Sequence, residues 1–542
     1  MAVSKRGFLC VIVVLSICGG YCVNAGPPDS WQVIVENAGV CAMQATLMRS
    51  NRVVFFDRTN FGASNITYQD GYCRENPKDM RSKRDCTAHS VAVDLATNKI
   101  TTLKIFTDTW CSSGSHKADG TLLQTGGWAD GADVTRTIGP GPKDDWIEYP
   151  NAPSALLTSR WYSSNHILPD NRVIIVGGRR AFSFEFQPRT KGEGLYSLPF
   201  LRDTLTPGSE HNLYPFVNLC PDGNLFIFAN QDSILLDYKA NKVLRKYPRI
   251  PEGPRNYPAS AAAALLPLTA ADGYGRAEIL ICGGAKPEAF SNTGKGIFDE
   301  ALSSCARMVL TDAAAKWRLV YMPIPRIMGD MLILPTAEVL IINGARKGTA
   351  GWQVAREPVL TPVTYDIYRD RFFTWRASTI PRLYHSVALM LPDGKVFVAG
   401  SNTNRGYEFS NVQYPTELRI EKYSPYYIAK SYDTRRPKIV SSPTVVKCAT
   451  SFRIAFEISQ NPVALKYHLY APPFTTHTYS MNQRMLVLKA NPVVSDPAKR
   501  TSFSATLYAP PNTVIAPAGY YLLTVINQGT PSPSVWVRIT AA

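Results

Sequence analysis

The stretch Val173-Ile174-Ile175-Val176-Gly177-Gly178 shows the pattern that decides the fold of this 542-residue chain. Its four β-branched residues favour a buried β-strand. The pair Asp170-Asn171 precedes it, and such pairs supply the positive φ angles that tight hairpin turns need. The segment therefore predicts a turn, then a buried strand, then a small-residue end.

The same arrangement recurs along the chain. Comparable apolar runs begin at Val53, Leu122, Val173, Leu225, Ile279, Val339 and Val396, and most end in a glycine or another small residue. A regular period of about 50 residues with a glycine pair after a strand is typical of kelch repeats, each of which forms a four-stranded blade. The regular spacing disfavours stacked sandwiches. We therefore predict an all-β fold with a seven-bladed kelch-type β-propeller over residues 26–432.

The repeat stops near residue 432. Residues 433–542 contain short alternating strands, such as Phe452-Arg453-Ile454-Ala455-Phe456, separated by turns that contain proline. This pattern predicts an immunoglobulin-like β-sandwich after the propeller. The 40 prolines and 36 glycines also argue against a helical bundle.

The segment 1–25 has the features of a secretory signal peptide. Lys5 and Arg6 form a short basic start, an apolar run follows, and Ala25 is the small residue that a cleavage site needs. The apolar run is far shorter than the ~20 residues of a membrane span, and no later stretch has the length of one. We therefore expect a secreted, extracellular protein without a membrane segment.

The net charge of the mature chain limits which kinds of molecule could bind it. The whole sequence carries +16, and the loss of Lys5 and Arg6 leaves +14. Secretion argues against nucleic acid, whereas an acidic polysaccharide is a natural counter-charge whose attraction weakens with salt. A role in keeping the protein soluble would explain the same excess of basic residues. The sequence Asn65-Ile66-Thr67 predicts a surface glycan at Asn65.

Several residues at one position of the repeat carry side chains that can bind a metal ion or take part in a reaction. They stand at a nearly constant distance before a repeat strand, except where an apparent insertion lengthens one step: Cys111, Tyr162, Tyr214, Tyr257, Met328 and Tyr384. The insertion lies between Tyr257 and Ile279. Equivalent positions in a propeller lie on a ring about its axis. If this ring is the inner one, a cysteine, several tyrosines and His385 converge at one mouth of the channel.

Two interpretations of these positions remain open. An arginine precedes three of the tyrosines by two residues, as in Arg160-Trp161-Tyr162, so the tyrosines could cap blades while the arginines satisfy loop carbonyls. We favour this structural role for Tyr214 and Tyr257. The adjacent Tyr384 and His385 instead offer metal-ligand atoms, and imidazoles with phenolates favour a tetragonal Cu(II) site.

A copper site needs a second histidine. His477 lies in the C-terminal domain, on an approach that follows Pro472-Pro473-Phe474 and has the character of a loop. The remaining histidines fit strands or turns well enough to need no ligand role; these are His89, His116, His166, His211 and His468.

Four motifs in order carry a family resemblance. They are Trp110-Cys111, Arg160-Trp161-Tyr162-Ser163-Ser164, Arg382-Leu383-Tyr384-His385-Ser386 and Thr476-His477-Thr478. Together with the repeat and the sandwich, they resemble the copper radical oxidases, the family of galactose oxidase and glyoxal oxidase. The plant glyoxal oxidase branch is the most similar. The resemblance covers essentially the whole mature chain.

The resemblance implies a set of roles. Cys111 and Tyr162 would be joined by a thioether, and the cross-linked Tyr162 would carry the oxidised radical. One copper ion per chain would be bound by Tyr162, Tyr384, His385 and His477. Tyr384 would also take the substrate proton as general base. Oxygen would reoxidise the site and leave as hydrogen peroxide.

The resemblance also bears on the substrate. Galactose oxidase stacks a tryptophan over its thioether, but the corresponding stretch 177–182 has none here. The N-terminal sugar-binding domain of that enzyme is also absent. Both differences favour small aldehydes such as glyoxal and methylglyoxal, oxidised to carboxylic acids. From their positions in the repeat, Arg180, Arg255 or Arg326 could hold the anionic or carbonyl end of the substrate.

Two other functions are compatible with the sequence. One is an alcohol oxidase resembling galactose oxidase that acts on cell-wall polysaccharide side chains. The other is a non-catalytic kelch module that binds carbohydrate or protein. The favoured interpretation places the enzyme in the apoplast or cell wall, with a peroxidase as a reasonable partner enzyme.

Eight cysteines remain beyond Ala25, an even number that suggests disulfides in a secreted chain. A thioether at Cys111 would leave seven, so at least one would be unpaired. Sequence proximity alone predicts the pairs Cys73–Cys86 and Cys282–Cys305.

Overall fold

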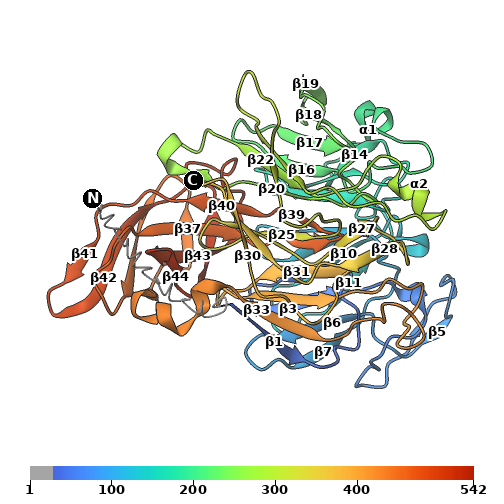
Figure 1. Cartoon of the computed structure of the whole chain (residues 1–542), viewed down its shortest axis with the longest axis horizontal. Coiled ribbons are helices and arrows are strands. Elements are labelled where there is room, and N and C mark those ends of the chain that lie inside the picture. Colours follow the sequence, from blue (N-terminus) through green and yellow to red (C-terminus); the bar gives the residue numbers. More distant parts are fainter. Residues whose placement is uncertain (1–28) are drawn as a thin grey trace, which may run out of the picture.

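The computed structural model describes residues 29–542, so the expected signal peptide of residues 1–25 lies outside the described residues. Strands dominate and fall into two groups, residues 30–424 and residues 438–540 (Figure 1). The only α-helices among the described residues are α1 (Pro199–Asp203) and α2 (Ala289–Thr293). None of the helices in this part of the chain has the length and apolar character of a membrane span. The expected all-β class is confirmed.

Seven antiparallel sheets take four strands each from the first group. The first three sheets contain β2 (Gln44–Leu47), β3 (Arg52–Phe56), β6 (Ser90–Asp94) and β7 (Ile100–Leu103); β8 (Ser113–His116), β9 (Leu122–Thr125), β10 (Thr135–Ile138) and β11 (Trp146–Tyr149); and β12 (Ser163–Ile167), β13 (Val173–Gly177), β14 (Ser183–Gln187) and β15 (Tyr196–Ser197). The next two contain β16 (Phe216–Leu219), β17 (Leu225–Ala229), β18 (Asp232–Asp237) and β19 (Lys242–Lys246); and β20 (Ala262–Leu265), β22 (Glu278–Cys282), β23 (Ser304–Val309) and β24 (Arg318–Tyr321). The last two contain β25 (Asp330–Ile333), β26 (Val339–Ile342), β29 (Val363–Asp366) and β30 (Arg371–Thr374); and β31 (Ser386–Met390), β32 (Val396–Gly400), β33 (Ile420–Ser424) and β1 (Ser30–Val35).

Each repeat run of the sequence forms the second strand of its sheet. These strands are almost entirely buried, which explains why their sequences are continuous apolar runs instead of alternating ones. The N-terminal strand β1 completes the last sheet, with Trp31 opposite Tyr423. This pairing joins the two ends of the repeat region, as closure of a propeller requires. The seven sheets are consistent with the expected seven blades.

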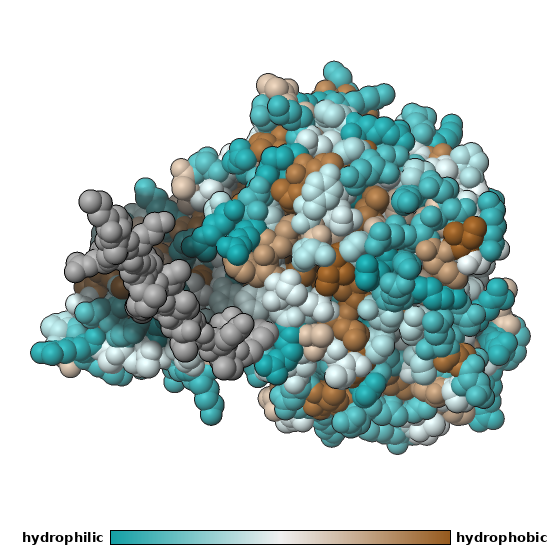
Figure 2. All heavy atoms as spheres, in the orientation of Figure 1, coloured by the Kyte–Doolittle hydropathy of each residue, from teal (hydrophilic) through white to brown (hydrophobic). Residues whose placement is uncertain are grey.

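The second group of strands forms two facing sheets, as the expected sandwich requires. One contains β34 (Lys438–Ser441), β36 (Ser451–Glu457), β42 (Lys499–Tyr508) and β41 (Val494–Asp496). The other contains β40 (Arg484–Val487), β37 (Lys466–Ala471), β43 (Gly519–Asn527), β45 (Val535–Thr540) and β35 (Val445–Lys447). Apolar side chains of both sheets, such as Phe456 and Leu523, belong to one core cluster. On the face that Figure 2 shows, hydrophobic residues occur in small groups among hydrophilic ones.

One hairpin of the C-terminal domain enters the propeller. It consists of β38 (Phe474–Thr476) and β39 (Tyr479–Met481), joined by His477 and Thr478. β38 pairs with β2, with Thr476 opposite Gln44. The hairpin also contacts β8, β12, β16, β20, β25 and β31, the first strands of the other six sheets. All seven first strands therefore surround this hairpin, and β39 lies among them in Figure 1.

The disulfide predictions are confirmed. Cys73 bonds Cys86, and Cys282 bonds Cys305. The other cysteines of the described part of the chain are unpaired and buried: Cys41, Cys111, Cys220 and Cys448.

Candidate metal centre

Six residues share one backbone position, one or two residues before the first strand of a sheet. Each has a positive φ, between 45° and 67°, which L-residues adopt rarely. The set comprises Cys111, Tyr162, Tyr214, Ser260, Met328 and His385. This result corrects the spacing count, which placed Tyr257 and Tyr384 here. The insertion before Ile279 and the slightly longer step before Val396 made the count fall on the wrong residues. The strand register shows that Ser260 and His385 occupy the equivalent position in these two sheets.

The two histidines of the expected copper site face each other. Their Nε2 atoms are 3.1 Å apart, and Cys111 Sγ lies 3.3 Å from His477 Nε2. Two nitrogen ligands about 2.1 Å from one metal ion and at right angles lie about 3 Å apart. The ligand atoms of these three buried residues all lie within 4.8 Å of one another. The group therefore fits one metal ion.

The surroundings keep both imidazoles neutral. Burial lowers the pKa of His477 to about 3. Burial, His477 and Arg58 hold the pKa of His385 well below its usual value. The Thr476 hydroxyl donates to the Met43 carbonyl oxygen and lies 2.7 Å from His477 Nδ1, so it can accept the Nδ1 proton. The lone pair of His477 Nε2 is then free for a metal.

Three tyrosines surround this pair. The Tyr384 ring stacks on His385 with centroids 3.7 Å apart, and the Tyr162 ring meets His477 edge-on at 5.9 Å. Tyr257 links the other two, because its hydroxyl lies 3.0 Å from Tyr384 Oη and accepts from Tyr162 Oη at 3.4 Å. Burial raises the pKa of Tyr257 to about 12 and those of Tyr162 and Tyr384 well above the usual value.

The backbone fixes Cys111 beside Tyr162. The Tyr162 amide donates to the Cys111 carbonyl oxygen at 2.9 Å, and the two side chains interact. Burial raises the pKa of the Cys111 thiol well above its usual value.

A cleft gives access to the tyrosines. A cavity of about 820 Å³ is lined by Tyr162, Tyr257 and Tyr384, together with Trp352 and Arg405. A second cavity of about 290 Å³ shares Tyr162 and Tyr257 with the first. The phenol groups of Tyr162 and Tyr384 therefore line a cleft that admits a small molecule, and the two buried imidazoles lie against these tyrosines.

Comparison with known proteins identifies the family. The family model for the glyoxal oxidase N-terminus matches residues 43–427. The chain belongs to the glyoxal oxidase family. A galactose oxidase-like Early set domain matches residues 436–539 of this family member.

Two curated relatives of this glyoxal oxidase family member span nearly the whole chain. The aldehyde oxidase GLOX of Vitis pseudoreticulata is 45% identical over 519 residues, which cover 94% of this chain and 97% of the relative. The aldehyde oxidase GLOX1 of Arabidopsis thaliana is 44% identical over 536 residues, which cover 95% of this chain and 86% of the relative. A fungal alcohol oxidase of the AA5 family in complex with copper has the same fold, with a TM-score of 0.71, 18% identity and coverage of 94% and 99%.

The structural interpretation of Tyr214 and Tyr257 holds for only one of them. Tyr214 is buried and donates to the Ser112 carbonyl oxygen at 3.0 Å, so it supports the loop after Cys111. Tyr257 lines the cleft and stacks on Tyr162 with centroids 4.7 Å apart. The spacing places Tyr257 among the ring residues, where a structural role is favoured for it, and its position in the cleft corrects that interpretation.

The stacking partner missing from the stretch 177–182 is supplied from elsewhere. Trp161, adjacent to Tyr162 in the sequence, packs on the Tyr162 ring with centroids 4.7 Å apart. Tyr257 covers the same ring at the same distance. The absence of a tryptophan from 177–182 therefore does not leave Tyr162 without aromatic cover.

The three expected substrate arginines have different positions. Arg255 is fully buried and donates to the Gly283 carbonyl oxygen and to Ser304 Oγ at 2.5 and 2.9 Å. Arg326 is buried and donates to the carbonyl oxygens of Asn343 and Thr361. Both guanidinium groups donate to backbone carbonyl oxygens of loops, so neither is available to contact the substrate. This result corrects the expected substrate role of Arg255 and Arg326.

Arg180 is the exception among the three. It is exposed and lines the smaller cavity beside Tyr162 and Tyr257. Its backbone has φ 60°, which directs the chain sharply after the glycine pair Gly177-Gly178. Arg180 therefore stays a candidate for substrate contact.

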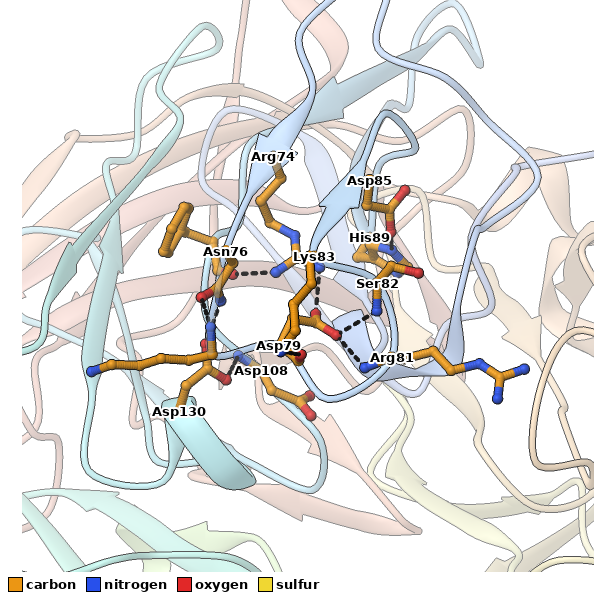
Figure 3. A network of polar contacts seen from close by, with 12 residues as sticks. Arg74, Asn76, Asp79, Arg81, Ser82, Lys83, Asp85, His89, Asp108 and Asp130 are labelled. Atoms are coloured by element: carbon orange, nitrogen blue, oxygen red, sulfur yellow. Dashed lines mark hydrogen bonds and ion pairs between the residues drawn. The ribbon is translucent and has the colours of Figure 1, made fainter.

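A buried and a half-buried carboxylate, Asp108 and Asp130, hold the loop that precedes Cys111 (Figure 3). Asp108 Oδ1 accepts from the Trp110 amide at 2.9 Å, and Asp130 accepts from the Asp108 amide at 3.2 Å. Nearby, the His89 imidazole lies between Asp57 at 3.0 Å and Asp85 at 2.9 Å. Burial opposes the charged imidazole, but the two carboxylates outweigh it and raise the pKa of His89 to about 9. His89 thus has a structural role, as the sequence predicts.

Proposed function

We propose that this protein is a secreted copper radical oxidase that converts small aldehydes, such as glyoxal and methylglyoxal, to carboxylic acids. The observation that carries the proposal is the convergence of Cys111, Tyr162, Tyr384, His385 and His477 in one buried cluster. The relatives that span nearly the whole chain at 44–45% identity are named aldehyde oxidases. Their names and this cluster support the same chemistry.

In this proposal, His385 Nε2, His477 Nε2, Tyr162 Oη and Tyr384 Oη hold one copper ion. Cys111 Sγ forms a thioether to the Tyr162 ring. When bound, copper accepts one electron from the substrate, and the oxidised Tyr162 side chain accepts the other. Trp161 and Tyr257 cover the Tyr162 ring and shield it from solvent.

Tyr384 is the proposed general base. As a phenolate it takes the hydroxyl proton of an aldehyde hydrate in the cleft. Tyr257 Oη lies 3.0 Å from Tyr384 Oη and can donate a hydrogen bond to it, which orients the acceptor oxygen. The hydrate loses two electrons and two protons to become the acid, and O2 takes up two electrons and two protons to become H2O2.

A direct test measures H2O2 release by copper-loaded, oxidised protein with glyoxal, methylglyoxal, glycolaldehyde, galactose and a galactose-bearing polysaccharide. We expect release with the small aldehydes and none from Tyr162→Phe, which removes one oxygen and keeps the ring. Release only with galactose or the polysaccharide would replace the aldehyde assignment with an alcohol oxidase. No release with any of them, together with absence of bound copper, would favour a kelch binding module.

The setting of the enzyme is part of the proposal. A cleaved segment 1–25 would place it in the apoplast or cell wall, where the +14 charge would favour acidic polysaccharides. Asn65 is exposed, as a glycan acceptor must be. The proposed partner enzyme is a peroxidase that consumes H2O2 or oxidises the resting enzyme. Release of the protein from isolated cell walls by salt, but not by neutral sugar, tests the charge.

A further inference from the structure

Tyr162 is one end of a chain of aromatic rings that leads out of the metal centre. Its ring lies 4.7 Å, centroid to centroid, from that of Trp161, and Trp161 lies 4.1 Å from Trp128. A branch runs from Trp161 to Trp110 at 4.8 Å and on to Trp352, stacked on Trp110 at 5.3 Å. Contacts this close let an electron pass from ring to ring, because tyrosine and tryptophan are the side chains most readily oxidised by one electron.

Nearby charges distinguish the two branches. Arg58 lies 4.2 Å above the Trp110 ring and 4.9 Å above Trp352, and Arg405 lies 5.4 Å above Trp352. A guanidinium above an indole disfavours its positively charged, oxidised form. Arg58 forms no ion pair with a carboxylate among the described residues. The branch through Trp110 and Trp352 is therefore the less favourable route for a positive charge.

The branch toward Trp128 carries less opposing charge. Arg179 lies 5.2 Å above Trp161, but its guanidinium is paired with Glu210 at 2.8 Å. No cation lies over the Trp128 ring among the described contacts. The Trp161 indole N–H is buried and interacts with the Cys111 side chain. With no cation over Trp128 in the described part of the chain, the branch through Trp128 is the more favourable route for a positive charge.

The Trp128 branch ends in a basic surface cleft. Trp128 and Trp161 line a cavity of about 410 Å³ together with Arg179 and Arg180. Because Glu210 neutralises Arg179, Arg180 supplies the free positive charge; it is exposed and has no ion-pair partner among residues 29–542. A small anion or an acidic surface would be attracted to this end of the chain.

We propose that Trp161 and Trp128 form a one-electron relay that connects Tyr162 to an anionic oxidant docked at Arg180. This inference rests on the proposed function, because it assigns a route for the oxidation that forms the Tyr162 radical. One electron leaves the Tyr162 phenolate, passes through Trp161 and Trp128, and reduces the oxidant by one electron. No bond forms or breaks. The route serves activation, and it leaves the larger cavity between Tyr162, Tyr257 and Tyr384 open to substrate.

Stopped-flow absorption of the tyrosyl radical tests the relay without any aldehyde. Protein loaded with Cu(II), in which Tyr162 is not yet oxidised, is mixed with ferricyanide, an anionic one-electron oxidant. We expect Trp128→Phe to slow radical formation by about tenfold or more, because phenylalanine is not oxidised at these potentials. Trp128→Tyr, which restores an oxidisable ring, should recover most of the rate. Trp317→Phe is the matched control, since its indole N–H faces the Pro248 carbonyl oxygen, outside the chain of rings.

The oxidant site has its own readout. Arg180→Glu should slow the reaction with ferricyanide and remove its decrease with salt, while a cationic cobalt(III) oxidant should react faster than with the wild type. H2O2 release by Trp128→Phe that is already fully oxidised should match the wild type. Equal rates of radical formation in Trp128→Phe and wild type would overturn the relay alone. Failure of the wild type to form a radical with any strong oxidant would overturn the proposed function and the relay with it.

Discussion

The Nε2 atoms of His385 and His477 lie 3.1 Å apart, although the residues are 92 positions apart in sequence and belong to different domains. His385 precedes β31 in a left-handed turn of the propeller. His477 and its neighbour Thr478 both have positive φ at the tip of the β38–β39 hairpin, a turn that usually favours Asn-Gly. This strained tip carries a ligand nitrogen to the propeller, so docking of the hairpin and assembly of the site are one event.

A metal ion at this pair should stabilise the fold. Copper that binds only the folded protein raises the free energy of unfolding, by about 3 kcal/mol when the free copper concentration is 100 times the dissociation constant. The midpoint of thermal unfolding rises accordingly. We expect this shift in the wild type and its loss in His477→Ala, with bound copper measured by elemental analysis. His468→Gln is the control, because His468 is buried against the Pro335 carbonyl oxygen and is not one of the facing histidines. Full copper content in His477→Ala would rule out the ligand assignment.

Tyr257 should tune the reaction without holding the metal. Its hydroxyl lies between those of Tyr162 and Tyr384, and the loss of one such hydrogen bond costs about 1 kcal/mol. We therefore expect Tyr257→Phe to keep its copper and to lower kcat with methylglyoxal by about five- to tenfold. A steady-state series with copper content measured in parallel checks this. An unchanged kcat would show that Tyr257 serves only as a wall of the cleft.

Arg255 and Arg180 should behave in opposite ways. Arg255→Ala leaves the carbonyl oxygen of Gly283 without its guanidinium donor, so we expect the free energy of unfolding to fall by about 2–4 kcal/mol. Arg180→Ala should leave stability unchanged and raise KM for aldehydes that carry an anionic group. Denaturant unfolding and substrate titration separate the two effects. A stable Arg255→Ala with a raised KM would restore Arg255 to the substrate site.

The pH dependence of stability should show the buried His89. Its pKa is raised from 6.5 to about 9 by Asp57 and Asp85, so the folded state binds more protons than the unfolded state between these values. This contribution is fully present below about pH 6.5 and is lost as pH rises through about 9. We expect the unfolding midpoint to fall over this range and the slope to weaken in His89→Asn, a variant of lower overall stability. An identical slope in the variant would mean that other groups cause it.

The repeat made most of the fold predictable. Each apolar run, such as Val173–Val176, is the second strand of its sheet, because a strand buried on both faces needs no alternation. The sandwich was predictable too, and sequence proximity was enough to predict both disulfides. In the structure, Cys282 and Cys305 lie opposite each other on β22 and β23.

The site was predictable only in part. Fixed spacing brings Cys111 and Tyr162 to one backbone position, but the insertion before Ile279 made the count assign that position to Tyr257. Tyr257 instead reaches the site from outside the repeat register. Spacing also could not separate Arg180 from Arg255, since the burial of a guanidinium depends on the carbonyls that fold around it. The aromatic cover from Trp161 depends on how one turn directs two adjacent side chains.

The most direct test of the central claim is peptide mass mapping of the mature protein after exposure to copper and oxygen. The account predicts that the peptides containing Cys111 and Tyr162 appear as one cross-linked species, lighter than their sum by two hydrogen atoms, and that Cys111 resists alkylation. A protein prepared without copper should give the two separate peptides. Recovery of alkylated Cys111 from the copper-exposed protein would contradict the account.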